Sequence, residues 1–185
     1  GYRTYATMRN LAKRDSIQPV ADKQHLSIRV VQLDVSDENS INDAIQSILS
    51  ESGRIDLLVN NAGYVLTGAF EDIGIDEIKA LYETNVFGVI RVTQAVLPIM
   101  RKQGSGRIIN ISSGAGRVGY PGDSAYVSSK FALEGLSESM AFFSMKTSSE
   151  SKAIWYKDLR ALFTARESLL NRSFINRSVF FANSD

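Results

Sequence analysis

A tyrosine and a lysine four residues apart, Tyr126 and Lys130, are the residues of this sequence best spaced to move a proton. Residues four apart share one face of a helix, so both side chains can reach one pocket. An ordinary tyrosine ionises near pH ~10, but an ammonium about 4 Å away, at an effective dielectric of about 20, stabilises a phenolate by about 4 kcal/mol. This corresponds to roughly three pKa units and brings a phenol close to neutrality. The pair therefore predicts general acid/base chemistry at a carbonyl or an alcohol.

Three short apolar runs are of the kind that form buried parallel strands. Each run is followed at once by residues that can bind a ligand. They are Asp34, the segment from Asn60 to Gly63, and the pair Ser112 and Ser113. The carboxyl ends of parallel strands meet at one edge of a sheet, and ligands bind outside that edge. We therefore expect these residues to surround one ligand site.

The apolar pattern predicts an alternation of strands and helices that would build this edge. The expected strands cover residues 2–8, 26–33, 55–59 and 107–111, and the expected helices lie within residues 9–24, 37–50, 76–103 and 123–145. Ser36 is expected to cap the helix over 37–50, and Gly53 to end it. The alternation is typical of an α/β fold, a Rossmann-like doubly wound parallel sheet in three α/β/α layers.

The composition indicates one ordinary globular domain. The chain has 185 residues, 44% of them hydrophobic, and a net charge of +1, so we expect no nucleic-acid partner. It contains no cysteine, and its one histidine, His25, lies in a polar stretch, so we expect no metal site. No apolar run reaches the length of a membrane span, and we expect a cytoplasmic protein.

Four motifs in the same order make residues 1–145 similar to the short-chain dehydrogenase/reductase family. They are Asn60-Asn61-Ala62-Gly63, Asn85-Val86-Phe87-Gly88, Ile111-Ser112-Ser113, and Tyr126 to Lys130. The segment from Ser129 to Ser139 most resembles the hydroxysteroid and retinol dehydrogenase branch. The resemblance implies an NAD(P)-dependent oxidoreductase that transfers a hydride to or from an alcohol or carbonyl substrate. It also implies a homodimer or homotetramer for the intact family member.

The resemblance implies a role for each catalytic position. Tyr126 would be the general acid/base, and Lys130 would favour its phenolate and bind the nicotinamide ribose. Ser113 would orient the substrate oxygen, and Asn85 would support a water that links Lys130 to solvent. The alternative for Asn85 is a helix-kink residue without a chemical part. We interpret Ser112 as a strand-end hydroxyl that is satisfied locally.

The same resemblance indicates the cofactor contacts. Gly63 and Ala62 would let a ribose approach the backbone, and Asn60 would bond the adenosine ribose, although a tight turn also favours Asn and Gly. Asp34 and Val35 match the family's adenine-contacting pair.

Cofactor specificity is indicated by the residue after the first expected strand. Arg9 stands where an acid would favour NAD and a basic residue favours the 2′-phosphate of NADP. We therefore expect NADP(H) to be preferred, with NAD(H) as the alternative.

Two departures from the family pattern define further expectations. A glycine-rich turn should precede Arg9 by about 20 residues, but only eight residues stand there. We therefore expect a fold that is incomplete at both ends, with apolar neighbours and unpaired edges where a central strand is missing. Residues 146–185 depart from the family pattern as an atypical tail, and if a change of reading frame produced them, we expect them not to pack as a family sheet strand. The apolar spacing predicts an amphipathic helix over 154–170.

Three interpretations of function remain open at this level. The first is an oxidoreductase acting on an apolar molecule such as a steroid or retinoid, with residues 64–66 and 119–121 lining the pocket. The second is a catalytically silent scaffold that acts through oligomerisation. The third is a fragment without function.

Overall fold

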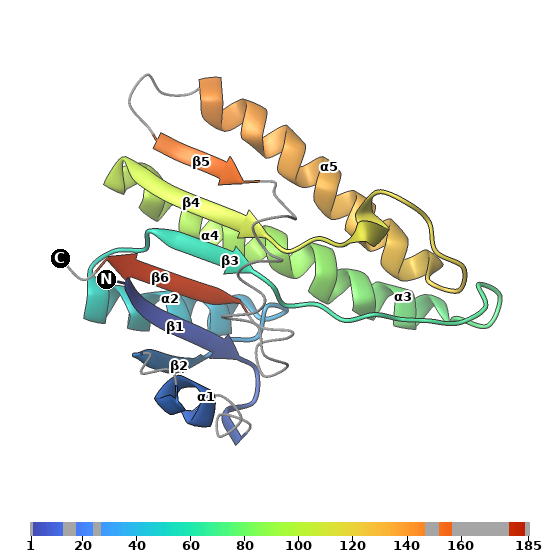
Figure 1. Ribbon diagram of the computed structural model, residues 1–185, viewed down its shortest axis with the longest axis horizontal. Coiled ribbons are helices and arrows are strands. Elements are labelled where there is room, and N and C mark those ends of the chain that lie inside the picture. Colours follow the sequence, from blue (N-terminus) through green and yellow to red (C-terminus); the bar gives the residue numbers. More distant parts are fainter. Residues whose placement is uncertain (1, 13–17, 24–26, 147–151, 157–177, 184–185) are drawn as a thin grey trace.

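The computed structural model describes residues 2–12, 18–23, 27–146, 152–156 and 178–183, which form one six-stranded sheet with helices packed on it (Figure 1). The strands are β1 (Tyr2–Met8), β2 (Ile28–Gln32), β3 (Leu57–Asn60), β4 (Ser105–Asn110), β5 (Lys152–Tyr156) and β6 (Val179–Asn183). The helices are α1 (Gln18–Lys23), α2 (Glu38–Ser52), α3 (Ile75–Tyr82), α4 (Gly88–Gln103) and α5 (Ser124–Lys146). Within this described part, no helix has the length and hydropathy needed to cross a bilayer.

The sheet is mainly parallel, and its strand order is β2-β1-β6-β3-β4-β5. β1 pairs in parallel with β2, and β4 pairs in parallel with both β3 and β5. Buried apolar residues of α2 and α4 pack against one face of the sheet and form the main core with β1, β3, β4 and β6. The predicted Rossmann-like alternation of strands and helices is confirmed, and it brings the carboxyl ends of β3 and β4 together.

Helix α2 begins with a cap that differs from the predicted one. The side chain of Asp37 accepts hydrogen bonds from the backbone N–H groups of Asn39 and Ser40, so Asp37 and not Ser36 is the capping residue. The Ser36 hydroxyl donates instead to Asp34, at 2.6 Å. Gly53 ends the helix in the left-handed conformation, with a φ of 71°, as the sequence predicts.

The helix expected over residues 76–103 is interrupted. A π-helical segment, Glu83–Phe87, separates α3 from α4, and Asn85 lies at its centre. A π-helical turn takes one more residue than an α-helical turn and is found mostly at functional sites. The interruption therefore changes the direction in which Asn85 projects, and the even apolar periodicity gave no sign of it.

Strand β6 contradicts the expectation of an unfilled sheet centre. It runs antiparallel between β1 and β3 and pairs with both (Figure 1). In dinucleotide-binding sheets of order 3-2-1-4-5-6, the first strand lies between the second and the fourth, and β6 takes the corresponding position. Phe180 and Ala182 are fully buried there. The facing edges of β1 and β3 are therefore paired.

The expectation that the tail does not join the sheet is also wrong. β5 pairs in parallel with β4, and β6 fills the centre, so the boundary at residue 145 does not separate the tail from the sheet. The proposed helix over 154–170 is contradicted at its start, because residues 154–156 belong to β5. Residues 157–170 lie outside the described residues.

Candidate active site

Tyr126 and Lys130 lie one turn apart on α5, and their side chains are close together. The Lys130 Nζ is 5.7 Å from the centre of the Tyr126 ring. The ammonium also donates a hydrogen bond of 2.9 Å to the carbonyl oxygen of Ile111, the residue after β4. Lys130 thus connects the phenol to the carboxyl end of the sheet, which is the arrangement that the spacing predicts.

Burial changes the protonation of Lys130. Only 6% of the residue is exposed, and removal of the ammonium from water lowers its pKa from 10.5 to about 8. The carboxylate of Glu134, one turn further along α5, opposes this effect and raises the pKa. The lysine is therefore poised to gain or lose its charge close to neutral pH.

The two serines after β4 differ in their surroundings. Ser113 begins a short 3₁₀ turn, Gly114–Gly116, and its Oγ accepts a hydrogen bond of 3.2 Å from the N–H of Ala115. The Ser112 Oγ is buried and has no partner among the described residues. The interpretation of Ser112 as a locally satisfied hydroxyl is therefore wrong. Ser113 is half-buried, and because its Oγ is the acceptor in this bond, its hydroxyl proton is still available to donate.

Asn85 connects the π-helical segment to the loop after β3. Its Nδ2 donates to the carbonyl oxygen of Tyr64 at 2.9 Å, and its Oδ1 accepts from the N–H of Tyr64 at 3.0 Å. The residue is fully buried. The paired bonds hold the backbone next to Gly63, and a Cβ built on Gly63 would lie 3.0 Å from the Asn85 Oδ1 and 3.8 Å from the Lys130 Nζ. Glycine at this position therefore keeps space open beside the ammonium.

Asn60 is turned into the interior. Its Nδ2 donates to Thr93 in α4 at 3.0 Å and to Asn110 in β4 at 2.9 Å, and only 2% of the residue is exposed. The side chain therefore ties β3 to its neighbours, and this arrangement does not support a bond to an adenosine ribose. Ala62, two residues later, packs partly buried against the main core.

The residues expected at the adenosine end lie together at the ends of β1 and β2. The Arg9 Nε is 4.0 Å from the Asp34 Oδ2, and the Arg9 side chain is 81% exposed. Val35 is buried and packs closely on Gly88, where an added Cβ would come within 2.6 Å of it. Arg9 is thus available to an anionic ligand, whereas the Val35 side chain serves the core.

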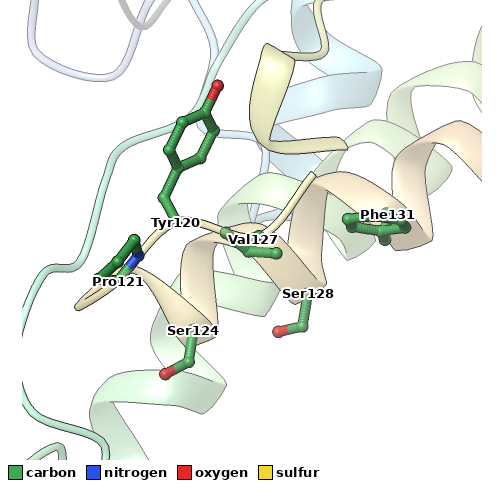
Figure 2. Close-up of a pocket in the computed structure, with 7 residues that line it drawn as sticks. Tyr120, Pro121, Ser124, Val127, Ser128 and Phe131 are labelled. Atoms are coloured by element: carbon green, nitrogen blue, oxygen red, sulfur yellow. The ribbon is translucent and has the colours of Figure 1, made fainter. Parts of the chain in front are cut away.

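An apolar groove of about 690 Å³ lies on another face of α5 (Figure 2). Its lining residues are Gly119, Tyr120, Pro121, Ser124, Val127, Ser128 and Phe131. Ser124, Val127, Ser128 and Phe131 are spaced three and four residues apart along α5, so they share one face of the helix, and Gly119 to Pro121 belong to the loop before it. Tyr126 and Lys130 are not among them. Residues 119–121 therefore line a groove, but it does not include the Tyr126–Lys130 pair or residues 64–66, so the expectation that both segments line the substrate pocket stays a prediction.

Two groups in the site were missed from the sequence. The Ile111 carbonyl is a backbone group, and residue type carries no signal for it. The Ser129 hydroxyl accepts a hydrogen bond of 3.2 Å from the Asn85 Nδ2, and its position inside the Tyr126 to Lys130 motif was the available signal. The structure thus brings Asn85, Gly63 and Ser129 together with Lys130.

This chain belongs to the short-chain dehydrogenase family, because the family model described as "short chain dehydrogenase" matches residues 1–148. A similar relative is 17-beta-hydroxysteroid dehydrogenase type 1 of Homo sapiens, which is 39% identical over 143 residues. That match covers 76% of this chain and 43% of the relative. The chain spans about half the length of the curated relatives it matches.

Solved structures with NADP or NAD⁺ bound share the fold. The structure "ElxO with NADP Bound" is 29% identical, with a TM-score of 0.74 over 89% of this chain and 67% of that chain. The NAD⁺-bound xylitol dehydrogenase is 30% identical, with a TM-score of 0.70 over 75% of this chain and 54% of that chain. These similarities support a nicotinamide dinucleotide as the cofactor of the fold.

Proposed function

We propose that this chain carries the proton-transfer site of an oxidoreductase that moves a hydride between NADP(H) and an apolar alcohol or carbonyl compound. The observation that carries the proposal is the buried Lys130 ammonium beside the Tyr126 ring, hydrogen-bonded to the end of β4. Burial of a cation costs several kcal/mol unless nearby groups pair with it. A buried ammonium beside a phenol therefore favours a chemical role for the pair.

Each residue of the proposed site has its own role in the reaction. During reduction, the Tyr126 hydroxyl donates its proton to the carbonyl oxygen, and during oxidation the phenolate accepts the proton of the alcohol. Ser113 donates a hydrogen bond to the same oxygen and orients it. Lys130 stabilises the phenolate by its charge. A bound nicotinamide supplies or accepts the hydride.

The space beside Lys130 fits the ribose next to a nicotinamide. Gly63 leaves this space open, since a side chain there would meet Asn85 and approach the ammonium. The Lys130 ammonium can donate a hydrogen bond to a ribose hydroxyl. For the cofactor's other end, the exposed guanidinium of Arg9 favours the 2′-phosphate of NADP(H) over NAD(H).

The side chains near the site favour an apolar substrate. Val65, next to the Tyr64 backbone that Asn85 binds, and Val118 are each 54% exposed. The loops that carry them are joined, because the N–H of Gly68 donates to the carbonyl of Gly122 at 2.8 Å. An exposed apolar rim of this kind suits a steroid, a retinoid or another lipid-like molecule.

The groove on α5 supports a homodimer or homotetramer. Phe131 is 47% exposed at this groove, and burial of such aromatic surface is a common driving force for association. The cytoplasmic location stays a prediction.

The experiment that tests the proposal replaces the phenol. We expect Tyr126→Phe to lower the rate of NADPH-dependent reduction of steroid and retinoid carbonyls at least about 10³-fold while the affinity for NADPH stays within about twofold, because the hydroxyl acts only in proton transfer. The matched control is Tyr5→Phe, which removes a buried hydroxyl that has no partner among the described residues of the chain. Full activity of Tyr126→Phe would remove Tyr126 from the mechanism.

A second candidate, a catalytically silent scaffold, is favoured by β6. The antiparallel β6 occupies the sheet position that in dinucleotide-binding folds leads into the diphosphate-binding turn. Titration of the chain with NADPH, followed by fluorescence, separates the two candidates. Saturable binding with turnover that depends on Tyr126 supports the enzyme, and a folded oligomer without binding supports the scaffold.

A further inference from the structure

Two loops at the carboxyl edge of the sheet are fastened to each other by two neighbouring hydrogen bonds. The Thr67 hydroxyl donates to the Asp123 Oδ1 at 2.7 Å, and the N–H of Gly68 donates to the carbonyl oxygen of Gly122 at 2.8 Å. Thr67 and Gly68 belong to the loop after β3, and Gly122 and Asp123 come directly before α5. We call the two bonds together the Thr67–Asp123 clasp, and its side-chain bond joins positions 56 residues apart.

The backbone bond of the clasp depends on a glycine conformation. Gly122 has a φ of 77°, in the left-handed region that residues with a side chain rarely adopt. A Cβ placed on Gly122 would meet the Thr67 Cγ2 at 3.7 Å, which is ordinary van der Waals contact. The space at this point would therefore accept an alanine, but the backbone would be strained by it.

The loop after β3 is held at the proposed active site by its other end. Asn85 donates to the carbonyl oxygen of Tyr64 at 2.9 Å and accepts from the Tyr64 N–H at 3.0 Å. Tyr64 follows Gly63, where an added Cβ would lie 3.8 Å from the Lys130 Nζ. Residues 64–66 are therefore fixed beside the proposed site at one end and by the clasp at the other.

The loop before α5 is held in a comparable way. The hydroxyl oxygen of Tyr120 lies 3.1 Å from the point where a Gly114 side chain would begin, and Gly114 directly follows Ser113. The Asp123 carbonyl accepts a hydrogen bond of 2.8 Å from the first turn of α5, and Tyr126 lies three residues after Asp123. This loop therefore lies next to the proposed site at Tyr120 and is joined to the other loop at Asp123.

We propose that Thr67 and Asp123 are positioning residues that hold segments 64–66 and 119–121 together as one rim of the substrate opening. The inference rests on the proposed function, because the rim would receive the apolar body of a substrate whose oxygen lies at Tyr126. A substrate of steroid size is long enough to reach the rim, whereas a small ketone bound at Tyr126 is not. The clasp therefore favours large apolar substrates over small ones.

The test uses variants that remove or keep the hydroxyl donor of the clasp. Thr67→Val removes the donor and keeps the branched shape of the side chain, and Thr67→Ser keeps the donor. Ser50→Ala is the matched control, because it removes an exposed hydroxyl that donates to the carbonyl of Ser47 at 2.9 Å within α2, outside both loops. If Thr67→Val does not fold, Thr67→Ala takes its place.

The first measurement is KM for a steroid ketone and for cyclohexanone, at saturating NADPH. Thr67→Val should raise KM for the steroid ketone about fivefold, the equivalent of about 1 kcal/mol, and change KM for cyclohexanone by less than about twofold, because only the larger ketone reaches the rim. The kcat for both ketones should stay within about twofold of wild type, since Thr67 takes no part in proton transfer. Thr67→Ser and Ser50→Ala should behave like wild type.

The second measurement needs no turnover. The Kd of the steroid ketone for the whole chain is determined by equilibrium dialysis, and the hydrogen exchange of the Gly68 N–H is followed by NMR. Thr67→Val should raise the Kd by the same factor as KM and speed the exchange, because the bond from Gly68 to Gly122 loses the support of its neighbour. Gly122→Ala, which strains the backbone half of the clasp, should change both quantities in the same direction.

The outcomes separate this inference from the proposed function. Unchanged binding of the steroid ketone in Thr67→Val would overturn the rim, with or without faster exchange at Gly68, and so would an equal rise of KM for cyclohexanone. Absence of turnover in a folded wild-type chain that binds the steroid ketone would contradict the proposed function, and the Kd of Thr67→Val would still decide the role of the clasp. A folded wild-type chain that does not bind the steroid ketone would overturn both.

Discussion

The catalytic turn and the centre of the sheet are built from the chain in different ways. The proposed catalytic turn, which comprises the first turns of α5 and the chain at the ends of β3 and β4, lies within residues 60–130, and its main pair is four residues apart. The centre of the sheet joins β1 to β6 (Figure 1), and Tyr2 pairs with Asn183. The first region is held by short-range geometry and buried polar contacts, and the second by apolar strands brought together from both ends of the sequence.

This difference indicates which region can change in sequence while the other region keeps its structure. A central strand is fixed by burial and by hydrogen bonds on both sides, and any apolar segment with the right alternation can supply them. The catalytic turn needs particular atoms, such as the Ile111 carbonyl under the Lys130 ammonium. An antiparallel segment fills the strand position, whereas the proposed catalytic turn contains the four sequence motifs that resemble the family.

The largest effect on stability is expected at the centre of the sheet. Phe180 is fully buried between β1 and β3, and Phe180→Ala should lower the free energy of unfolding by about 3–5 kcal/mol because it leaves a cavity in the core. Urea denaturation measures this change. Phe70→Ala, at a residue that is 69% exposed, is the control and should change it by less than about 0.5 kcal/mol. Equal effects of the two variants would mean that β6 does not hold the sheet.

A smaller change in the free energy of unfolding, of opposite sign, is expected in the proposed catalytic turn. A fall in the Lys130 pKa from 10.5 to about 8 corresponds to a cost of roughly 3 kcal/mol for keeping the ammonium buried at pH 7. Lys130→Met removes this cost and loses one hydrogen bond, so at pH 7 it should raise the free energy of unfolding by about 2 kcal/mol while activity disappears.

The pH dependence of that gain follows from the direction of the pKa. The folded-state pKa of Lys130 lies below that of the unfolded chain, so below about pH 8 both states carry the charge and the cost is complete. Between about pH 8 and 10.5 the folded lysine is neutral while the unfolded one is still charged, and wild-type stability rises with pH relative to Lys130→Met. A stability difference that is the same at pH 7 and pH 10.5 would contradict the burial of the charge.

The smallest effect concerns the charge beside the lysine. Glu134 raises the pKa of Lys130, so Glu134→Gln should lower this pKa further and move the alkaline limb of kcat/KM to lower pH. The limb is measured over the same pH range in Glu138→Gln, which removes a carboxylate one turn further along α5 and should leave it in place. An alkaline limb that moves to higher pH in Glu134→Gln would contradict the statement that Glu134 raises the pKa of Lys130.

The sequence was sufficient for the local parts of this arrangement. Spacing of four residues predicted that Tyr126 and Lys130 share a face, because a helix repeats every 3.6 residues. The apolar runs predicted β3 and β4, and hence that both strands end at one edge of the sheet, where Asn60 pairs with Asn110. These inferences depend on neighbours in the chain, and the periodicity of a segment is sufficient to make them.

The remaining features depend on contacts that periodicity does not report. β6 was not predicted, because Val179 to Asn183 find their partners in β1 and β3, more than 100 positions away in the sequence. The inward turn of Asn60 depends on Thr93 and Asn110, which come from two other elements. The π-helical segment that aims Asn85 leaves the apolar pattern of the surrounding helices unchanged.

The most direct test of the account is transfer of deuterium from NADPH that is deuterated at the transferring carbon of the nicotinamide. The folded wild-type chain is incubated with this cofactor and an apolar ketone, and the alcohol product is analysed by mass spectrometry. We predict that deuterium appears in the alcohol with wild type and with Tyr5→Phe, and falls to background with Tyr126→Phe. Deuterium at the wild-type level in Tyr126→Phe, or none with the folded wild-type chain, would contradict the proposed proton-transfer site.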